Sequence, residues 1–200
     1  MSMFPTPNDI KRNMVLLFDV FRLKPESTAK FSTDSVGVGQ SFALAPFLFP
    51  IFFFWIMNYT LTLDDSLSAS SIGIRALFLY STLWTLFPVV LYARGIRNNL
   101  RRFVVARNWL LVANMLIMMI ASLGAPFTVI GVVVGLYLNV VTWFIIKDSF
   151  SLTNGKTFLW FFVEVFLNSS IMLYYFISVG IDFEKYIENV TAAANAANGG

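Results

Sequence analysis

The sequence predicts an all-α integral membrane protein, in which a five-helix transmembrane bundle follows an N-terminal interfacial amphipathic helix. Two observations support this class. Of the 200 residues, 58% are hydrophobic and only 12% are charged, and the mean hydropathy is +0.72, whereas an average soluble domain is about 25% charged. The hydrophobic residues also form runs as long as the roughly 20 residues that a helix needs to cross a bilayer.

Five such runs are bounded by charged residues, glycine or proline. One uncharged stretch, residues 109–146, would extend roughly 57 Å as a single helix, nearly twice a bilayer core of about 30 Å. Gly124-Ala125-Pro126 therefore marks a reversal, because glycine favours a helix end and proline a helix start. The predicted spans are about residues 41–63, 74–93, 103–124, 126–146 and 157–181.

The basic residues predict the orientation of these spans. Twelve of the 14 lysines and arginines fall on one side, and only Arg75 and Lys185 fall on the other. Because loops rich in lysine and arginine stay in the cytoplasm, we expect a cytoplasmic N-terminal segment over residues 1–40. A transmembrane domain over residues 41–181 and an extracytoplasmic tail over residues 182–200 follow.

The interfacial helix is predicted over residues 9–23. Apolar side chains recur there at helical spacing, interrupted by charged residues such as Lys11 and Arg22. Asn8 is the expected N-cap, and the helix should end near Pro25.

The composition also excludes much chemistry. The chain has no histidine and no cysteine, so it offers neither imidazole nor thiolate to a metal, a haem or an iron–sulfur cluster. It also lacks the parts of a Ser/His or Cys/His nucleophile. We therefore expect no enzymatic activity, no cofactor, and neither a catalytic nor a metal site.

An intramembrane polar cluster is the sharpest candidate site. Glu164 lies about two turns into the fifth predicted span, where an isolated charge costs several kcal/mol. Asn168 follows one turn later, and Asn139 and Asn114 lie at depth in the fourth and third spans. The cluster is either a proton or cation relay, or a structural feature in which Glu164 is hydrogen-bonded or paired with an arginine near the cytoplasmic face.

Two further patterns concern binding. A cytoplasmic patch of arginines is expected to hold anionic headgroups or an acidic partner, or simply to fix the orientation; it comprises Arg94, Arg97, Arg101, Arg102 and Arg107. Gly131 and Gly135 form a small-residue pair that allows close helix packing, either within the chain or against another one. We expect no nucleic-acid partner, since the net charge is only +3.

The first fifty residues carry a resemblance. Residues 16–25 read LLFDVFRLKP, and Ala29, Phe31 and then Ser41-Phe42 follow at the start of a proline-containing span. This pattern resembles small bacterial membrane proteins related to the Ypt-interacting (Yip) family, whose five spans and cytoplasmic amino terminus also fit. The chain lacks the long cytosolic region and the Asp-Leu-Tyr-Gly-Pro motif of the eukaryotic members. The resemblance implies a non-enzymatic protein of the bacterial inner membrane.

From these observations we expect an accessory, assembly or structural subunit that packs against a larger membrane complex and its lipids. One alternative is a small transporter or proton-coupled carrier that uses Glu164. Another is a lipid-binding or membrane-shaping protein that acts through the N-terminal helix and the arginine patch.

Overall fold

A computed structural model describes residues 4–63, 67–121 and 125–181 together with Glu184, Ile187 and Thr191; at positions 62, 118, 121 and 125–130 it describes the backbone alone. All regular structure among these residues is helical, so the predicted all-α class is confirmed. The elements are α1 (Pro7–Phe21), the 3-10 helix η1 (Ser27–Lys30), α2 (Ser35–Ala43), α3 (Ala45–Leu63), α4 (Ala69–Ala93), α5 (Leu100–Ala121), α6 (Ala125–Phe150) and α7 (Asn154–Val179).

Four helical segments of the described chain are long and apolar enough to cross a membrane. They are Ser35–Leu61, Ala69–Ala93, Gly131–Phe150 and Asn154–Val179. Large apolar side chains also project from these helices into the surroundings, a pattern expected where lipid rather than water is the solvent; examples are Phe47, Phe54, Phe78, Phe158 and Phe162. The chain is therefore described as a multi-pass membrane protein.

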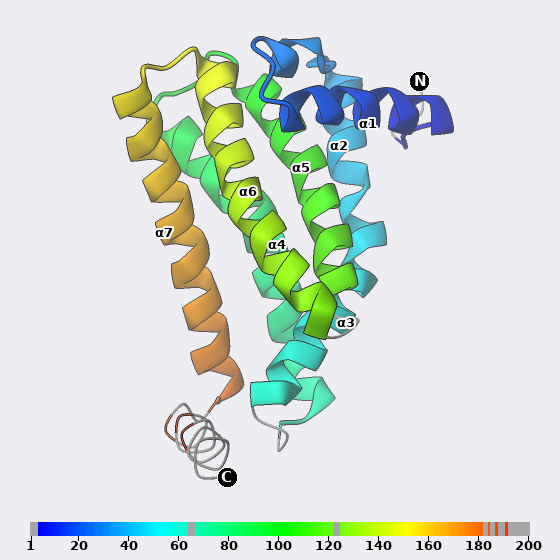
Figure 1. Ribbon diagram of the computed structural model, residues 1–200, viewed down its shortest axis with the longest axis vertical. Coiled ribbons are helices and arrows are strands. Elements are labelled where there is room, and N and C mark those ends of the chain that lie inside the picture. Colours follow the sequence, from blue (N-terminus) through cyan, green and yellow to red (C-terminus); the bar gives the residue numbers. More distant parts are fainter. Residues whose placement is uncertain are drawn as a thin grey trace.

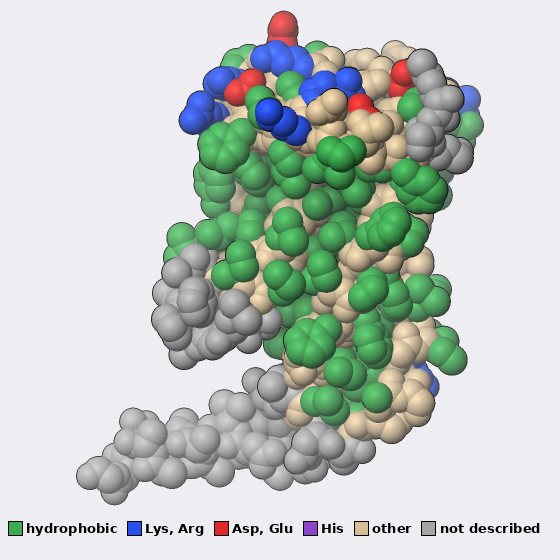
Figure 2. Space-filling view, turned by 90° about the vertical axis from the view of Figure 1, so that its right-hand side faces the viewer, with side chains coloured by type: hydrophobic (Ala, Val, Ile, Leu, Met, Phe, Trp, Pro, Cys, Tyr) green, Lys and Arg blue, Asp and Glu red, His purple; other side chains and the backbone are tan. Residues whose placement is uncertain are grey.

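The long helices run side by side, and α1 lies across one end of the bundle (Figure 1). On the face drawn in Figure 2, most charged side chains gather at that end, and hydrophobic side chains cover the surface below it. Helix α1 with the segment that follows it, the α4–α5 connection and the α6–α7 connection all lie at this end, and basic residues occur in or beside each of them (Figure 1). We call this the basic end of the bundle.

The first long apolar segment is broken, where the sequence predicted one uninterrupted span. Helix α2 ends at Ala43 and α3 begins at Ala45. Pro46 explains the break, because a proline has no N–H to donate and its ring disfavours helical backbone in the preceding residue. The Tyr80 hydroxyl of α4 donates to the Ala45 carbonyl at 2.7 Å, which fixes the break against the bundle.

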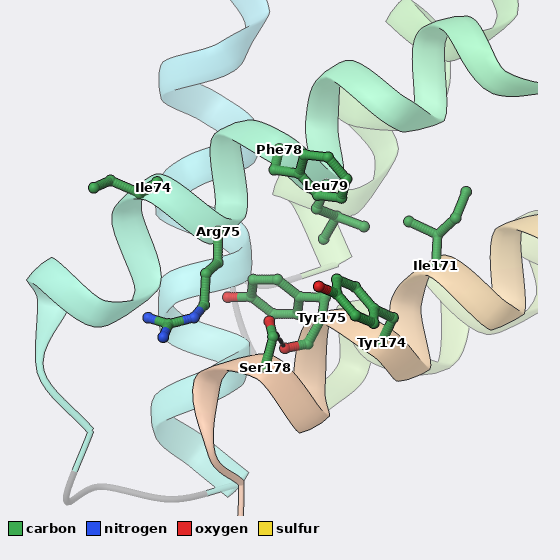
Figure 3. A pocket seen from close by; sticks show the side chains of 8 residues that line it. All are labelled: Ile74, Arg75, Phe78, Leu79, Ile171, Tyr174, Tyr175 and Ser178. Carbon is green, nitrogen blue, oxygen red and sulfur yellow. Dashed lines mark hydrogen bonds between the residues drawn. The ribbon is translucent and has the colours of Figure 1, made fainter.

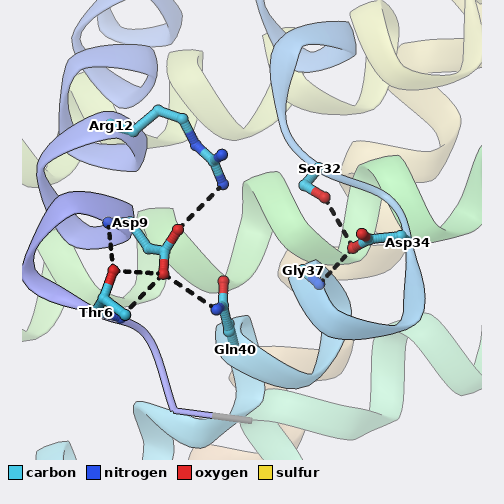
Figure 4. A network of polar contacts seen from close by, with 7 residues as sticks. All are labelled: Thr6, Asp9, Arg12, Ser32, Asp34, Gly37 and Gln40. Carbon is cyan, nitrogen blue, oxygen red and sulfur yellow. Dashed lines mark hydrogen bonds and ion pairs between the residues drawn. The ribbon is translucent and has the colours of Figure 1, made fainter. Parts of the chain in front are cut away.

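Helix α1 begins two residues earlier than expected, and its N-cap is Thr6 rather than Asn8. The Asp9 backbone N–H donates to the Thr6 hydroxyl oxygen, and the Asp9 carboxylate accepts from the Thr6 backbone N–H, a reciprocal capping box. Gln40 of α2 also donates to Asp9, at 3.2 Å (Figure 4). Hydrogen bonds from the Thr6 hydroxyl and backbone hold the pKa of Asp9 below its usual value, so this carboxylate remains an ionised acceptor at neutral pH.

A second capping network orients the start of α2. Asp34 accepts from the Gly37 backbone N–H at 2.6 Å and from the Ser32 hydroxyl at 2.8 Å (Figure 4). A Cβ atom at position 37 would lie 2.5 Å from the Ser32 carbonyl oxygen. This turn therefore requires glycine, because any side chain would collide with backbone.

Helix α5 is the centre of the fold. It contacts α1, α2, α3, α4, α6 and η1, and its Trp109 side chain is almost fully buried. Near the basic end, the buried Phe103 ring lies 5.6 Å from Phe87 of α4 and 5.3 Å from Phe150 of α6. Aromatic packing at these distances joins α4 and α6 to α5.

The predicted reversal between the third and fourth spans falls between the end of α5 and the start of α6. Residues 122–124, which include its Gly124, lie outside the described residues. The predicted extracytoplasmic tail also lies largely outside them.

Candidate functional site

A buried ion pair joins α5 and α7. The Arg107 Nε donates to Glu164 Oε1 at 2.7 Å, and the two side chains are 4% and 5% exposed. Arg107 Nη2 also donates to the Leu83 carbonyl of α4 at 3.0 Å. One guanidinium thus holds three helices together. Of the two interpretations of Glu164 that the sequence left open, this geometry matches the structural one, in which an arginine is its partner.

The ion pair is incompletely hydrogen-bonded. Arg107 Nη1 and Glu164 Oε2 are both buried, and neither has a hydrogen-bond partner among the described residues. A buried polar atom without a partner costs about 1–3 kcal/mol, and more when the group is charged. The surroundings therefore compensate the ion pair only in part.

Both side chains line a groove that the sequence analysis did not anticipate. It has a volume of about 380 Å³ and lies between α5, α6 and α7. All four residues of the predicted polar cluster line it, together with the ion-pair arginine; the polar lining comprises Arg107, Asn114, Asn139, Thr142, Glu164 and Asn168. Helix packing thus brings these separate positions together in one place, which is referred to below as the polar groove.

The amides of the polar groove are poorly satisfied by the protein. Asn139 is exposed and donates to the Gly135 carbonyl of its own helix at 2.9 Å. Asn114 and Asn168 are partly exposed, and no hydrogen bond joins either side chain to the described residues. Hydrocarbon cannot pair with amides, so the groove requires polar contents.

The small-residue pair of α6 borders the same groove. Gly135 is one of the lining residues, and a Cβ atom placed there would meet no other heavy atom within 4 Å. Gly131 lies one turn earlier and is partly exposed. Of the two interpretations left open by the sequence, Gly135 does not support packing within the chain, because nothing in the described chain packs against it.

The predicted arginine patch is divided between the surface and the interior. Arg94, Arg97 and Arg101 are exposed at the basic end, and Arg97 lies 4.7 Å from the centre of the Tyr92 ring. The patch prediction is wrong for Arg107, because α5 is buried on all sides from Phe103 to Leu110, and within this stretch Arg107 meets Glu164. Arg102 also turns inward, as described next.

Asp148 is a site residue that the sequence analysis missed. It accepts hydrogen bonds from the Glu26 N–H at 2.7 Å, the Thr28 N–H at 3.0 Å and the Thr28 hydroxyl at 2.6 Å. Arg102 forms an ion pair with it at 3.3 Å and donates to the Thr28 hydroxyl at 2.7 Å. The carboxylate thus fastens η1 to the ends of α5 and α6.

We predict that Asp148→Ala releases the N-terminal segment without unfolding the bundle. Each hydrogen bond to a charged group contributes about 1.5–3 kcal/mol, so losing several should accelerate trypsin cleavage after Lys30 by roughly tenfold or more. Glu26→Gln is the matched control, because Glu26 uses only its backbone N–H in this contact. Equal cleavage rates in the two variants would contradict the assignment.

Comparisons of the chain with protein-family models, curated proteins and solved structures found no match.

Proposed function

We propose that this protein is a non-enzymatic accessory or assembly subunit of the bacterial inner membrane, and that it packs against a larger membrane complex by receiving a transmembrane helix in its polar groove. A single observation carries the proposal. The groove combines amide side chains that the described residues leave unsatisfied with an open glycine position on α6.

A protein helix suits this groove better than a lipid tail does. Helices associate in membranes where small residues allow close approach and where polar side chains bond across the interface. Gly135 provides the close approach, and Asn139 on α6 and Asn168 on α7 provide hydrogen-bond donors and acceptors. Acyl chains would leave these groups unpaired.

The proposed topology has five spans, because α5 crosses the membrane in addition to the four long apolar segments described above. From Phe103 to Ala121 the only charged residue of α5 is Arg107, and its charge is compensated inside the bundle by Glu164. The basic end then faces the cytoplasm by the positive-inside rule. In the proposed topology the amino terminus is cytoplasmic and the carboxyl terminus is extracytoplasmic.

Helix α1 is proposed to lie in the cytoplasmic interface. It buries Leu17 and Val20 against the bundle, but Val15 and Phe18 are about 60% exposed. Lys11 and Arg22 border the same outward face. A face that alternates apolar and basic side chains suits the boundary between acyl chains and anionic headgroups.

Site-specific photo-cross-linking in native membranes tests the proposal. A photoreactive benzoyl-phenylalanine at Leu136, which is 67% exposed at the groove, should form an adduct with one defined membrane protein. Val89 of α4 is the matched control, because it is 58% exposed and does not line the polar groove. If Leu136 yields only lipid adducts, or the same proteins as Val89, the proposal fails.

A proton-coupled carrier is the second candidate, and the position of Glu164 in the lining of the groove favours it. A carboxylate that borders a polar groove at membrane depth is a possible proton site. The test is solute and proton flux in proteoliposomes. Flux in the natural protein that disappears in Glu164→Gln would support the carrier, whereas the absence of flux in the natural protein would dismiss it.

A further inference from the structure

A second groove lies near the end of the bundle opposite the basic end, between α4 and α7. Its volume is about 290 Å³. Figure 3 shows that Arg75 and Phe78 project from α4 on one side, and that Tyr174, Tyr175 and Ser178 project from α7 on the other. None of these residues contributes to the polar groove.

Arg75 provides a cation in this groove that forms no ion pair with the described residues. Its side chain is exposed, and Nη1 donates to the Ser71 carbonyl at 2.7 Å. Among the described residues no carboxylate lies within ion-pair distance of it, and the other described lysines and arginines lie nearer the basic end or inside the bundle. An exposed guanidinium with unused N–H groups is a strong ligand for phosphate.

The rest of the groove is apolar with hydroxyl groups at its border. Phe78 is 58% exposed and Tyr174 is 61% exposed, and the two rings meet edge to face with their centres 6.4 Å apart. Ile171 lines the groove further along α7. Tyrosines with this exposure are typical of the membrane interface, where the ring faces acyl chains and the hydroxyl faces headgroups.

The depth of Arg75 agrees with a headgroup site. It lies six residues after the start of α4, which corresponds to about 9 Å along a helix axis. A long arginine side chain reaches the headgroup region from that depth. The apolar part of the groove then continues from Arg75 toward the membrane interior.

We propose that this groove binds an anionic phospholipid of the leaflet on that side, with the phosphate on the Arg75 guanidinium and an acyl chain along Phe78 and Ile171. The combination of a cation with a continuing apolar surface selects an amphiphile. A free phosphate ion would use only the guanidinium and would gain nothing from the apolar wall.

The test uses the full-length protein in a neutral detergent and phosphatidylglycerol that carries a photoreactive diazirine in its acyl chain. We expect labelling of the α7 peptide that contains Ile171 and Tyr174. Unlabelled phosphatidylglycerol should compete, whereas diacylglycerol and inorganic phosphate should not. Arg75→Gln should reduce the labelling about fivefold, and Arg75→Lys should reduce it less, since lysine keeps the charge but loses the two-pronged geometry.

The control variant is Arg97→Gln, which removes an exposed arginine at the basic end and should leave this labelling unchanged. Because Arg75 is exposed, its substitution is not expected to affect folding, which the retention time in size-exclusion chromatography checks. The proposal is overturned if the α7 peptide is not labelled, if Arg75→Gln is labelled as strongly as the natural protein, if diacylglycerol competes equally, or if inorganic phosphate removes the label.

Discussion

Arg107→Ala and Glu164→Ala are each expected to lower the free energy of unfolding by about 3–5 kcal/mol, because each leaves a buried charge without its partner. Both side chains are at least 95% buried and joined at 2.7 Å. For a chain of this length the loss corresponds to a fall in Tm of roughly 6–20 °C. Thermal unfolding in detergent measures it.

The double variant Arg107→Leu with Glu164→Leu separates charge burial from packing. Because both charges are removed together, it should be much more stable than either single variant, and it can equal the natural protein. Arg101→Ala is the matched control, since Arg101 lies on the same helix but is exposed; its Tm should change little. If both single variants have the same Tm as the Arg101→Ala control, the ion pair does not hold the helices together.

Gly135→Leu is expected to have the largest effect on assembly. A Cβ atom at this position meets nothing within 4 Å, so the leucine side chain fits the isolated fold and occupies the groove instead. Forcing extra methylenes into a filled interface costs about 1–3 kcal/mol. The amount of the larger complex that co-purifies should therefore fall by roughly tenfold or more.

Gly39→Leu provides the control for this substitution. Gly39 lies in α2, and a Cβ atom there also meets nothing within 4 Å, so the change in helix propensity is the same. Native gel electrophoresis after gentle extraction compares the two variants. Equal amounts of complex in Gly135→Leu and Gly39→Leu would show that the polar groove is not the assembly surface.

Hydropathy predicted the membrane class and the approximate helices, because long apolar runs have few other uses. The same reasoning identified Glu164 and the three asparagines, since polar residues within apolar runs are conspicuous. The groove in which they meet required the helix packing, because Asn114 and Asn168 lie on α5 and α7, with α6 between them in sequence.

The partner of Glu164 was harder to predict. Arg107 lies 57 residues away and follows four other arginines, so the positive-inside rule assigned it to the surface patch. Its depth distinguishes it from Arg101, because Arg101 lies at the exposed start of α5, whereas every residue from Phe103 to Leu110 is buried. The uncharged residues 103–106 that precede Arg107 in the sequence were the available signal.

Local capping was predicted with the correct mechanism at the wrong residue. Asn8 and Thr6 are both good N-caps, but only Thr6 is followed three residues later by an acidic side chain, Asp9, that completes a capping box. Asp148 had no local signal at all, because its partners Glu26 and Thr28 are contributed by η1, more than a hundred residues earlier.

Cysteine accessibility in native membranes tests the central claim most directly, namely that a protein helix fills the polar groove. The chain contains no cysteine, so Asn139→Cys, at an exposed position in the groove, gives a single reporter thiol. Ser151→Cys, at the exposed turn after α6, is the water-accessible reference. We predict that a water-soluble maleimide labels Ser151→Cys in membranes and after purification, but labels Asn139→Cys only after the protein is separated from its complex. Labelling of Asn139→Cys in native membranes as fast as Ser151→Cys would mean a water-filled groove, and would contradict the account.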